Sequence, residues 1–408
     1  MNAGMRKATT EMIEQFADWV KSLVRDVQSV HDSSGVGGLE RRIRQEGQAL
    51  LGRTFECLLQ AALDGLPAAR ECPQCGRRRR HKGVRERGLL SSVGAVRLRG
   101  PYWYCPDCGG EHALAALADG SASVVMRELL CLLGTALGSF AKASVASGKL
   151  LGVRVGKDLI RQLCLQEGAR VAVCPAEASK QEQVVGSCDG TMVHTRQSGW
   201  RELKAYQFRY GSHKHGRAYL ESSDRFVPRL RAAAAALKAG RAAGLFWVSD
   251  AAEWIDKGVA KQLPPAIRII DIWHAWQHVH EASSEVYPED ASRAGQWAAR
   301  YCADLEDYGG LAVWRRLRHA TYAEPSRQAA VDALRAYLRK NADRLDYPRY
   351  KANGWPISSG PMESFCKQLG QRLKGPGMRW SEHNIDPMAT LTSLWANDEW
   401  DQYWRNVA

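Results

Sequence analysis

The sequence lacks any long apolar run. None of its 408 residues lies in an uninterrupted apolar stretch of about 18, the length that a helix needs to cross a bilayer, so we expect no membrane span. The first twenty residues carry acids where a secretory signal needs an apolar block, and tandem repeats and low-complexity tracts are missing. These absences argue against membrane, secreted, fibrous and disordered proteins.

Cysteines are few for the length, and acids are fewer than bases. The eleven cysteines are mostly scattered, which fits a reducing cytosol better than a disulfide scaffold. The 57 Lys and Arg outnumber the 44 Asp and Glu and give a net charge of +13. A polyanion is therefore the first partner to consider.

Changes in hydrophobic period along the chain predict an α/β multidomain protein. Helical spacing dominates the N-terminal part, a short Gly- and Arg-rich segment follows, and strand patterns between helices then predict a core with a mixed sheet. A helical insertion and a last long helix with a Trp-rich tail complete the chain. The predicted regions are residues 1–66, 67–112, 113–180, 181–280, 281–352 and 353–408.

Two helical regions flank the short segment. The apolar spacing from Met5 to about Leu66 predicts two or three helices, broken at the turn-like stretch 32–38. These helices could pack on the rest of the protein or form a dimer contact. Residues 140–151 and 157–173 predict two helices around a Gly-containing turn. That pattern matches a helix-turn-helix unit and an ordinary helical hairpin equally well.

Two cysteine pairs share the pattern C-P-x-C-G. Four thiolates in two such knuckles supply a tetrahedral zinc site, and the glycine after each pair permits a tight turn around the metal. We predict one structural Zn²⁺, with a β-hairpin between the pairs. The expected ligands are Cys72, Cys75, Cys105 and Cys108. The other seven cysteines show no ligand spacing and are expected to be small buried apolar residues.

A basic run lies beside the first knuckle. Such runs usually form a solvated face, but this one belongs to the predicted zinc module, which also carries the aromatic run Tyr102–Tyr104. We therefore expect contacts with nucleic-acid phosphates. The residues concerned are Arg77, Arg78, Arg79, Arg80 and Lys82.

Two aspartates follow predicted buried strands. The strand 184–188 is expected to end at Asp189, where Gly190 turns the chain, and the strand 245–248 leads to Asp250. Each strand would deliver its aspartate to the rim of the sheet. Taken alone, such an aspartate is more often a turn former than a catalytic residue.

The helix predicted from Pro361 onward supplies a third carboxylate. At about 100° per residue, Glu363, Lys367 and Lys374 fall in one sector beside an apolar stripe. A salt-bridged surface helix remains an alternative. The basic segment after the helix, which includes Arg379, suits an edge that meets phosphates. Two aspartates and a glutamate are what a two-Mg²⁺ phosphoryl-transfer site needs, because hard divalent ions prefer carboxylate oxygens.

Together these residues resemble bacterial insertion-sequence transposases of the Kra type. The matching segments are Asp189–Thr191, Val248–Ile255, Asp271–Ala275 and Met362–Trp380, and the resemblance covers about residues 181–404. It implies a DDE enzyme with a ribonuclease-H-like core and a largely helical insertion between the second aspartate and the glutamate. It also implies that Asp189, Asp250 and Glu363 are the metal-binding triad for two Mg²⁺ or Mn²⁺ ions.

The pair Asp271 and His274 is similar to the D/C-x-x-H motif of Mutator-like transposases. The resemblance implies that His274 lies near the active site and assists DNA positioning or strand separation. A helix-start aspartate with a buried histidine is the alternative. His274 and His278 are four residues apart, a metal-ligand spacing, but no adjacent glutamate completes H-E-x-x-H, so we predict no zinc there.

The leading hypothesis is a DNA transposase that cleaves hydrolytically at element ends and then joins the 3′-OH to target DNA. Its expected partners are transposon-end and target DNA and a second copy of the chain, in the cytoplasm at the nucleoid. A DNA-binding regulator, which retention of all three carboxylates disfavours, and a structure-specific nuclease on the same fold are the alternatives. Backbone phosphates are expected at Lys367, Arg372, Lys374 and Arg379.

Overall fold

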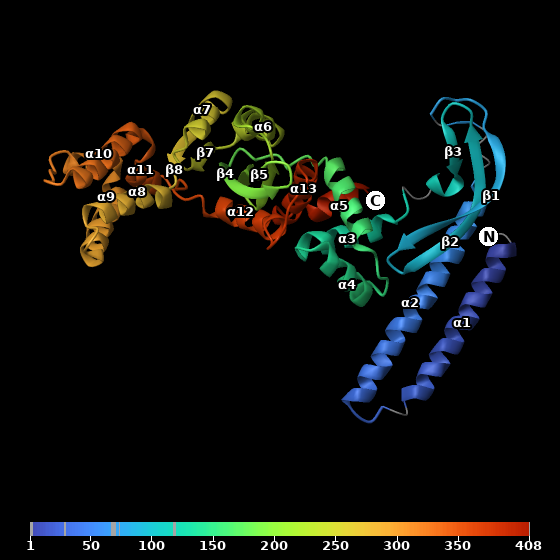
Figure 1. Cartoon of the computed structure of the whole chain (residues 1–408). Helices are drawn as coiled ribbons and strands as arrows, with labels where there is room; N and C mark the ends of the chain where they lie inside the picture. The colour runs from blue at the N-terminus through green and yellow to red at the C-terminus, as the bar shows by residue number, and fades with distance from the viewer. Residues whose placement is uncertain (1–2, 28–29, 67–70, 73, 117–119, 408) are drawn as a thin grey trace. The chain divides into compact units, whose positions relative to one another are not determined.

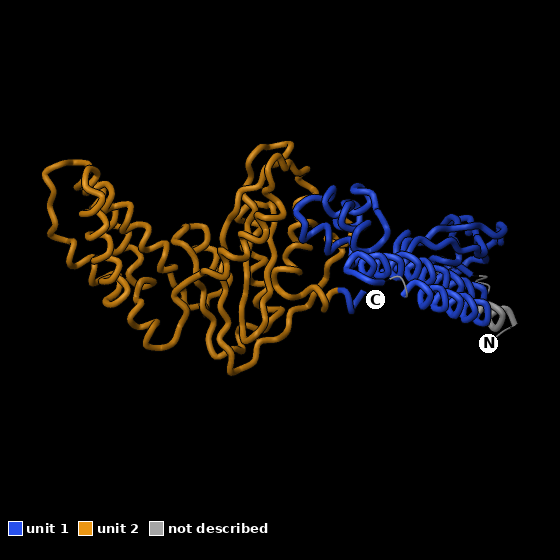
Figure 2. Tube along the Cα trace, turned by 90° about the horizontal axis from the view of Figure 1, so that it is seen from below, with its two compact units in different colours: residues 1–164, 404–408 blue, residues 165–403 orange. Residues whose placement is uncertain are grey.

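The computed structural model describes residues 3–27, 30–66, 71–72, 74–116 and 120–407. They fall into two compact units, residues 1–164 with 404–408, and residues 165–403 (Figure 2). The finer division into six regions stays a prediction, and the expected start of the zinc module at Pro67 lies outside the described residues. Among the helices that are described, none combines the length and the apolar character needed to span a membrane.

The first unit begins with two long helices that run side by side (Figure 1). They are α1 (Ala3–Val27) and α2 (Ser33–Asp64), and Trp19 Nε1 donates a hydrogen bond across them to Glu46 (3.0 Å). The predicted break at residues 32–38 is wrong in its extent. Asp32 caps α2 by accepting a hydrogen bond from the Gly35 amide (2.8 Å), so the glycine-containing stretch starts a helix.

A hairpin of two twelve-residue strands follows. β1 (Arg80–Ser91) pairs antiparallel with β2 (Gly94–Cys105), which also pairs with β3 (Gly109–His112). The predicted hairpin between the cysteine pairs is therefore confirmed. The two short strands expected at residues 95–99 and 102–104 are parts of one strand. Apolar side chains of the hairpin pack on Leu63 of α2 and build the small core of this module.

Helices follow the hairpin, and the boundary between the two units falls within the last of them, after Cys164. They are the short η1 (Ala113–Ala116), α3 (Val124–Ala136), α4 (Phe140–Leu151) and α5 (Lys157–Arg170). The predicted helix pair around a turn is confirmed as α4 and α5. Gly152 ends α4 at φ 68°, a left-handed cap that glycine adopts at low cost. The Ser147 hydroxyl accepts a hydrogen bond from the Val155 amide (3.0 Å) and fixes the turn.

The second unit is built on a five-stranded mixed sheet with the strand order β6-β5-β4-β7-β8. β4 pairs antiparallel with β5 and β5 with β6, whereas β4 and β7, and β7 and β8, run parallel. This confirms the mixed α/β class. The strands are β4 (Gln183–Thr195), β5 (Gly199–Tyr210), β6 (His213–Tyr219), β7 (Gly244–Ser249) and β8 (Ile267–Ile270).

The expected end of β4 at Asp189 is wrong. The strand continues to Thr195, because β5 pairs with it along its length: Asp189 lies opposite Ala205 and Gly190 opposite Lys204. Gly190 is thus a strand residue and does not turn the chain. Its parallel neighbour β7 is shorter and its last pair is Gly186 with Trp247. Asp189 therefore sits in mid-strand, just beyond the stretch that β7 covers.

The central strands separate two cores. Trp247 packs with residues of α6 (Ser223–Ala236) and α7 (Glu253–Gln262), whereas Phe246 and Val248 belong to the core of the helical segment. This alternation follows from the two-residue period of a strand. The helical segment consists of α8 (Ile272–Val286), α9 (Ala291–Leu317), α10 (Pro325–Lys340) and α11 (Tyr347–Ala352); the short helices η2 (Ala239–Arg241) and η3 (Ala342–Arg344) lie in loops.

The helical segment leaves the sheet and returns to it at one place. The Ile272 amide donates to Ile357 O (3.0 Å), and the Asp271 carboxylate accepts from the Ser359 amide. Directly afterwards comes α12 (Gly360–Leu373), with Pro361 in its first turn as predicted. The chain ends with η4 (Glu382–Asn384), α13 (Ile385–Ala396) and α14 (Trp400–Val407).

Candidate functional site

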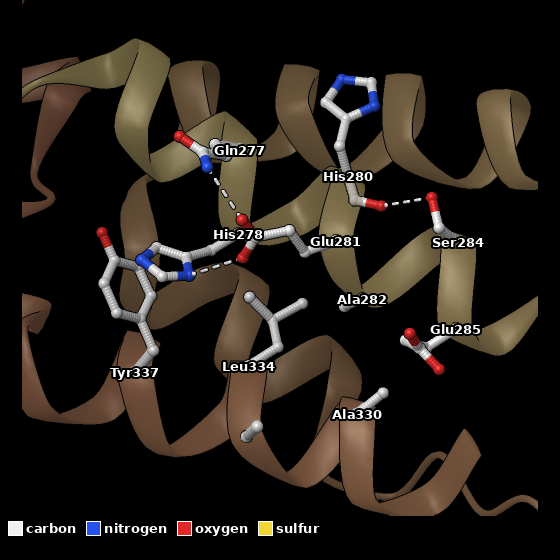
Figure 3. Close-up of a pocket in the computed structure, with 11 residues that line it drawn as sticks. Gln277, His278, His280, Glu281, Ala282, Ser284, Glu285, Ala330, Leu334 and Tyr337 are labelled. Carbon is white, nitrogen blue, oxygen red and sulfur yellow. Dashed lines mark hydrogen bonds and ion pairs between the residues drawn. The ribbon is translucent and has the colours of Figure 1, made fainter. Parts of the chain in front are cut away.

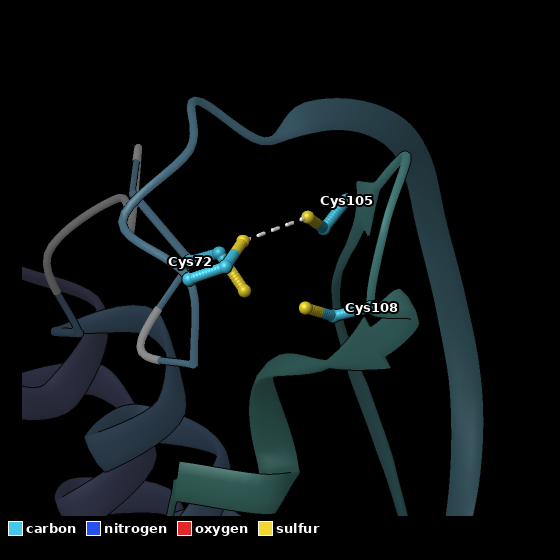
Figure 4. A group of neighbouring side chains, drawn as sticks. Cys72, Cys105 and Cys108 are labelled. Carbon is cyan, nitrogen blue, oxygen red and sulfur yellow. Dashed lines mark hydrogen bonds between the residues drawn. The ribbon is translucent and has the colours of Figure 1, made fainter.

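Four cysteine sulfurs gather at the base of the hairpin (Figure 4). All four lie within 4.8 Å of one another, and Cys75 Sγ is 3.5 Å from Cys105 Sγ. A zinc ion with four thiolates at about 2.3 Å holds its sulfurs about 3.8 Å apart, so the set could hold a zinc ion. Gly76 and Gly109 have φ of 73° and 89°, which confirms the predicted need for glycine after each pair.

The electrostatics of this cluster favour a cation. Backbone amides of Gln74 and Cys75 donate to Cys72 and lower its pKa to about 6, whereas hydrogen bonding to Cys75 raises the pKa of Cys108 to about 12. The sulfurs thus compete for protons, which a bound metal ion would replace. The guanidinium of Arg79 also contacts Cys72 and pairs with Glu111 at 2.7 Å.

The basic run divides into two groups. Arg77 pairs with Asp107 (2.9 Å) and Arg79 is held by Glu111, so these two arginines brace the metal module. The other members, Arg78, Arg80 and Lys82, are exposed. Cations and rings alternate along the same hairpin: Lys82 Nζ lies 5.9 Å from the Tyr104 ring centroid and the Arg85 guanidinium 3.7 Å from that of Tyr102.

The two aspartates lie at the same level of neighbouring parallel strands. Asp189 is three residues beyond Gly186 and Asp250 three beyond Trp247, and these two reference residues pair. The two strands are therefore side by side only three residues before the aspartates, and the charge of Asp250 reaches Asp189. Burial raises the pKa of Asp189, and the negative charges of Asp250 and Glu363 raise it further. The structure therefore brings the three carboxylates close enough to repel.

Glu363 reaches this place from the first turn of α12. The predicted apolar stripe of α12 is confirmed, because Met362, Phe365, Leu369 and Leu373 are all buried. On the same helix the Cys366 thiol donates a hydrogen bond to Asp189, and its pKa is raised by burial and by that carboxylate. The helix thus packs on the side of β4 that carries Asp189.

The carboxylates form a looser set than the cysteines. Within the described ranges, the cysteine group is the set of three or more candidate ligands whose atoms all lie within 4.8 Å. Asp189, Asp250 and Glu363 could supply carboxylate oxygens to divalent cations, whose positive charge would offset the repulsion among these three side chains. The residues present therefore fit a divalent-ion site in their chemistry.

Asp271 and His274 occupy the start of α8. Asp271 is fully buried and caps the helix by accepting from the Trp273 amide (2.7 Å). Burial opposes ionisation of Asp271, but the nearby His274 side chain and hydrogen bonds from the Ser359 and Trp273 amides outweigh it and lower its pKa. The Asp271 carboxylate, whose Oδ1 lies 3.7 Å from His274 Nδ1, raises the pKa of His274, and the charges of Asp250 and Asp189 act in the same direction. His274 therefore lies within electrostatic reach of both strand aspartates.

The basic residues around α12 are not equivalent. Lys367, Lys374 and Arg379 are exposed, and Lys367 Nζ is 3.7 Å from Glu363 Oε2. Arg372, in contrast, is only 2% exposed, and its guanidinium lies 5.1 Å from the Trp380 ring centroid. Its expected role in holding a phosphate does not fit this burial.

Sequence reasoning missed two charged side chains beside Gly190 and one exposed tryptophan at the start of α8. Lys204 and Glu202 form an ion pair on β5, and a Cβ on Gly190 would lie 2.2 Å from Glu202 Oε1. Their signal was two charges on one face of a strand otherwise rich in buried residues. Trp273, 56% exposed on the first turn of α8, packs against Trp276 with ring centroids 4.8 Å apart.

The expectation that the scattered cysteines are buried is wrong for Cys57 and Cys174, which are exposed.

A cavity of about 690 Å³ lies between α8 and α10 (Figure 3). His278 lies at one end, where its ring centroid is 4.1 Å from that of Tyr337 and its Nδ1 is 3.3 Å from Glu281 Oε2. His278 is therefore engaged by neighbours on its own helix and on α10.

No protein-family model matches the chain, and no curated protein matches it. Among solved structures, it is similar to the Drosophila P element transposase strand transfer complex, with 8% sequence identity. The match covers 71% of this chain and 81% of that chain, at a TM-score of 0.28. Agreement at that level assigns no shared fold.

Proposed function

We propose that this chain is a DDE-type DNA transposase of an insertion sequence, with a ribonuclease-H-like core. The observation that carries the proposal is the alignment of Asp189 and Asp250 at equal distance beyond one β4–β7 pair, with Glu363 in electrostatic contact. The sheet supports it, since three antiparallel strands adjoin two parallel ones. The resemblance of these segments to Kra-type transposases supplies the reaction.

The carboxylates, His274 and the basic residues around α12 would have different roles in the reaction. Asp189, Asp250 and Glu363 would hold two Mg²⁺ or Mn²⁺ ions, which when bound activate the attacking oxygen and stabilise the leaving one. His274, whose raised pKa favours the imidazolium form, would hold a phosphate near the strand aspartates. Lys367, Lys374 and Arg379 would contact DNA backbone phosphates next to the carboxylates. The buried Arg372 would instead keep Trp380 and the end of α12 in place.

The zinc module would bind DNA without taking part in the chemistry. Four thiolates would occupy all four coordination positions of a tetrahedral zinc ion and leave none for water, so the ion's role would be structural. Exposed Arg78, Arg80 and Lys82 would contact phosphates. The cation–aromatic pairs of the hairpin add flat surfaces for sugars or bases.

The test uses DNA from the ends of the element that encodes the protein. Incubation with Mg²⁺ or Mn²⁺ should give nicks at the element boundary and joined products with target DNA. Asp250→Asn should remove both. Asp401→Asn, an exposed carboxylate on α14, should leave both unchanged.

Each other outcome has a meaning. Metal-dependent cleavage without joining would replace the transposase with a structure-specific nuclease. Tight DNA binding with neither product, in a sample whose Asp250→Asn variant binds equally well, would indicate a DNA-binding regulator. Full activity of the Asp250→Asn protein would refute the assignment of the site.

A further inference from the structure

The helices α3, α4 and the first half of α5 share one core. A Cβ on Gly134 of α3 would lie 2.6 Å from Cys164 Sγ and 3.2 Å from Ile160 Cγ2, both on α5. The same Cβ would lie 3.4 Å from Phe140 Cε1 at the start of α4. The pair α4–α5 is therefore not an isolated hairpin, because α3 packs closely against both of its helices.

The turn between α4 and α5 is held on several sides. Gly152 ends α4 in the left-handed region, and the Ser147 hydroxyl accepts a hydrogen bond from the Val155 amide within the turn. Arg44 and Gln48 of α2 donate hydrogen bonds to the last three carbonyls of α4. A turn fixed in this way sets the direction in which α5 leaves α4.

Within the first unit, α5 buries one face and exposes the other. Ile160, Leu163 and Cys164 are at most 6% exposed. Arg161 and Gln162 are exposed. At about 100° per residue, Gln162 lies within about 30° of the direction opposite the buried face, and Arg161 lies about 70° from it. Both side chains therefore extend into solvent from the beginning of α5.

The exposed side chains of α5 are of the types that read DNA bases. The guanidinium of arginine can bind O6 and N7 of guanine together, and the amide of glutamine can bind N6 and N7 of adenine. The Asp158 carboxylate lies one helical turn before Arg161, with its Oδ1 3.8 Å from Arg161 Nε. That contact can orient the guanidinium fork for a base edge.

The charge around this face selects a polyanion as its partner. Residues 139–164 hold five lysines and arginines against one acid, Asp158. All five bases are exposed, so their charges are available to a ligand. The major groove of duplex DNA is about 12 Å wide and admits one α-helix, which fits a single exposed helix better than a flat surface. The five are Lys142, Lys149, Arg154, Lys157 and Arg161.

We propose that α5 is a recognition helix that reads a short sequence in the major groove of duplex DNA. Arg161 and Gln162 contact base edges, and Arg154 and Lys157 contact the flanking phosphates. The inference rests on the proposed function in that the sequence read lies at the ends of the element. It supplies the sequence specificity that phosphate contacts of the zinc module do not carry.

The first experiment selects duplexes from a randomised library with the full-length Asp250→Asn protein, without Mg²⁺ or Mn²⁺, so that binding is measured apart from cleavage. One short sequence should be enriched, and it should occur in the element ends. Adding Gln162→Ala should reduce discrimination at one base pair roughly 10- to 100-fold. Adding Gln15→Ala, at an exposed glutamine of α1, is the matched control and should leave the enriched sequence unchanged.

Two further variants separate base reading from loss of structure. Arg161→Lys keeps the charge but not the planar fork, so it should relax the preference for one guanine while affinity for random duplex DNA stays the same. Lys157→Ala should weaken binding to all sequences alike and reduce the slope of log affinity against log salt by about 1. A misfolded α5 would lower specific and random binding together, which circular dichroism and the random-DNA affinity would reveal.

Enrichment of no sequence would overturn the inference, and so would the same enriched sequence in the Gln162→Ala, Arg161→Lys and parent proteins. The proposed function can fail separately. A wild-type protein that binds the enriched sequence through α5, but neither cleaves nor joins it with Mg²⁺, would retain the recognition helix and refute the transposase. Cleavage confined to the element ends in both the wild type and Gln162→Ala would retain the transposase and refute the recognition helix.

Discussion

The cysteine cluster and the carboxylate site each collect side chains from separate stretches of chain, but by different means. The cysteines come in two short knuckles joined by one hairpin, and each knuckle is shaped by its own backbone, as the Gly76 amide bonded to Cys72 O (2.8 Å) illustrates. The carboxylates come from two strands and a helix, and their proximity depends on the register of β4 with β7 and on the packing of α12.

The difference shows in how tightly each set is held. The sulfurs lie within 4.8 Å of one another, and the lowered thiol pKa of Cys72 reflects local amides. The carboxylates are not gathered as tightly, and burial, followed by the charges of Asp250 and Glu363, raises the pKa of Asp189. A locally shaped site can be close to its bound geometry before the metal arrives, whereas a site assembled by tertiary packing keeps charges that only its ligand relieves.

The largest expected effect is loss of the cysteine-bound metal. Cys105→Ser should abolish binding of one zinc ion and unfold the hairpin module, because structural zinc contributes roughly 10–16 kcal/mol to such folds. Metal analysis together with hydrogen exchange of β1 and β2 measures it. Cys174→Ser, at an exposed cysteine outside the cluster, is the control. Retention of zinc by Cys105→Ser would show that the cluster is not its site.

The second effect concerns the carboxylates and should leave the fold intact. Asp189→Asn should reduce DNA cleavage at least about a thousandfold, of the order of 4 kcal/mol in transition-state free energy, while its unfolding temperature without metal stays at or above that of the wild type because repulsion is removed. Mg²⁺ should raise the unfolding temperature of the wild type and not of this variant. Equal stabilisation of both by Mg²⁺ would place the ion elsewhere.

A third change tests the register that aligns the aspartates. A Cβ on Gly186 would lie 2.5 Å from the buried Trp247 ring and 2.9 Å from Phe208, so Gly186→Ala should destabilise the second unit by about 1–3 kcal/mol through overpacking. Urea unfolding measures this loss. Gly295→Ala in α9, where nothing lies within 4 Å of the new Cβ, should be neutral or stabilising. Equal stability of both variants would mean that the strand pair tolerates displacement.

The smallest effect separates two arginine roles within the zinc module. Arg80→Ala should weaken DNA binding uniformly and reduce the slope of log affinity against log salt by about 1, without changing stability. Arg79→Ala removes the contacts to Glu111 and Cys72 and should lower the thermal stability of the module. Titration with labelled DNA at several salt concentrations distinguishes them; an unchanged salt slope for Arg80→Ala would remove it from the interface.

Sequence patterns predicted local features well. The C-P-x-C-G spacing, the α4–α5 pair and the buried stripe of α12 depend on residues close in sequence, and each is as expected. Errors arose where a distant partner decides the outcome. The sequence predicts a turn at Gly190, but β5 pairs across it, and it predicts a phosphate contact at Arg372, which is buried beside Trp380. A short stretch of sequence does not show which residues far along the chain will pair with it or bury it.

The bonds that join Asp271 to Ser359 and Ile272 to Ile357 have a consequence for how this protein can evolve. These bonds hold the start and the end of the helical segment α8–α11 together. The length of that segment therefore does not determine where α12 begins. Residues added in the exposed connection between α9 and α10 would lengthen the helical segment without displacing Glu363. Insertions and deletions should therefore accumulate there among descendants of this chain, whereas the few residues between Ser359 and Glu363 should keep a constant length.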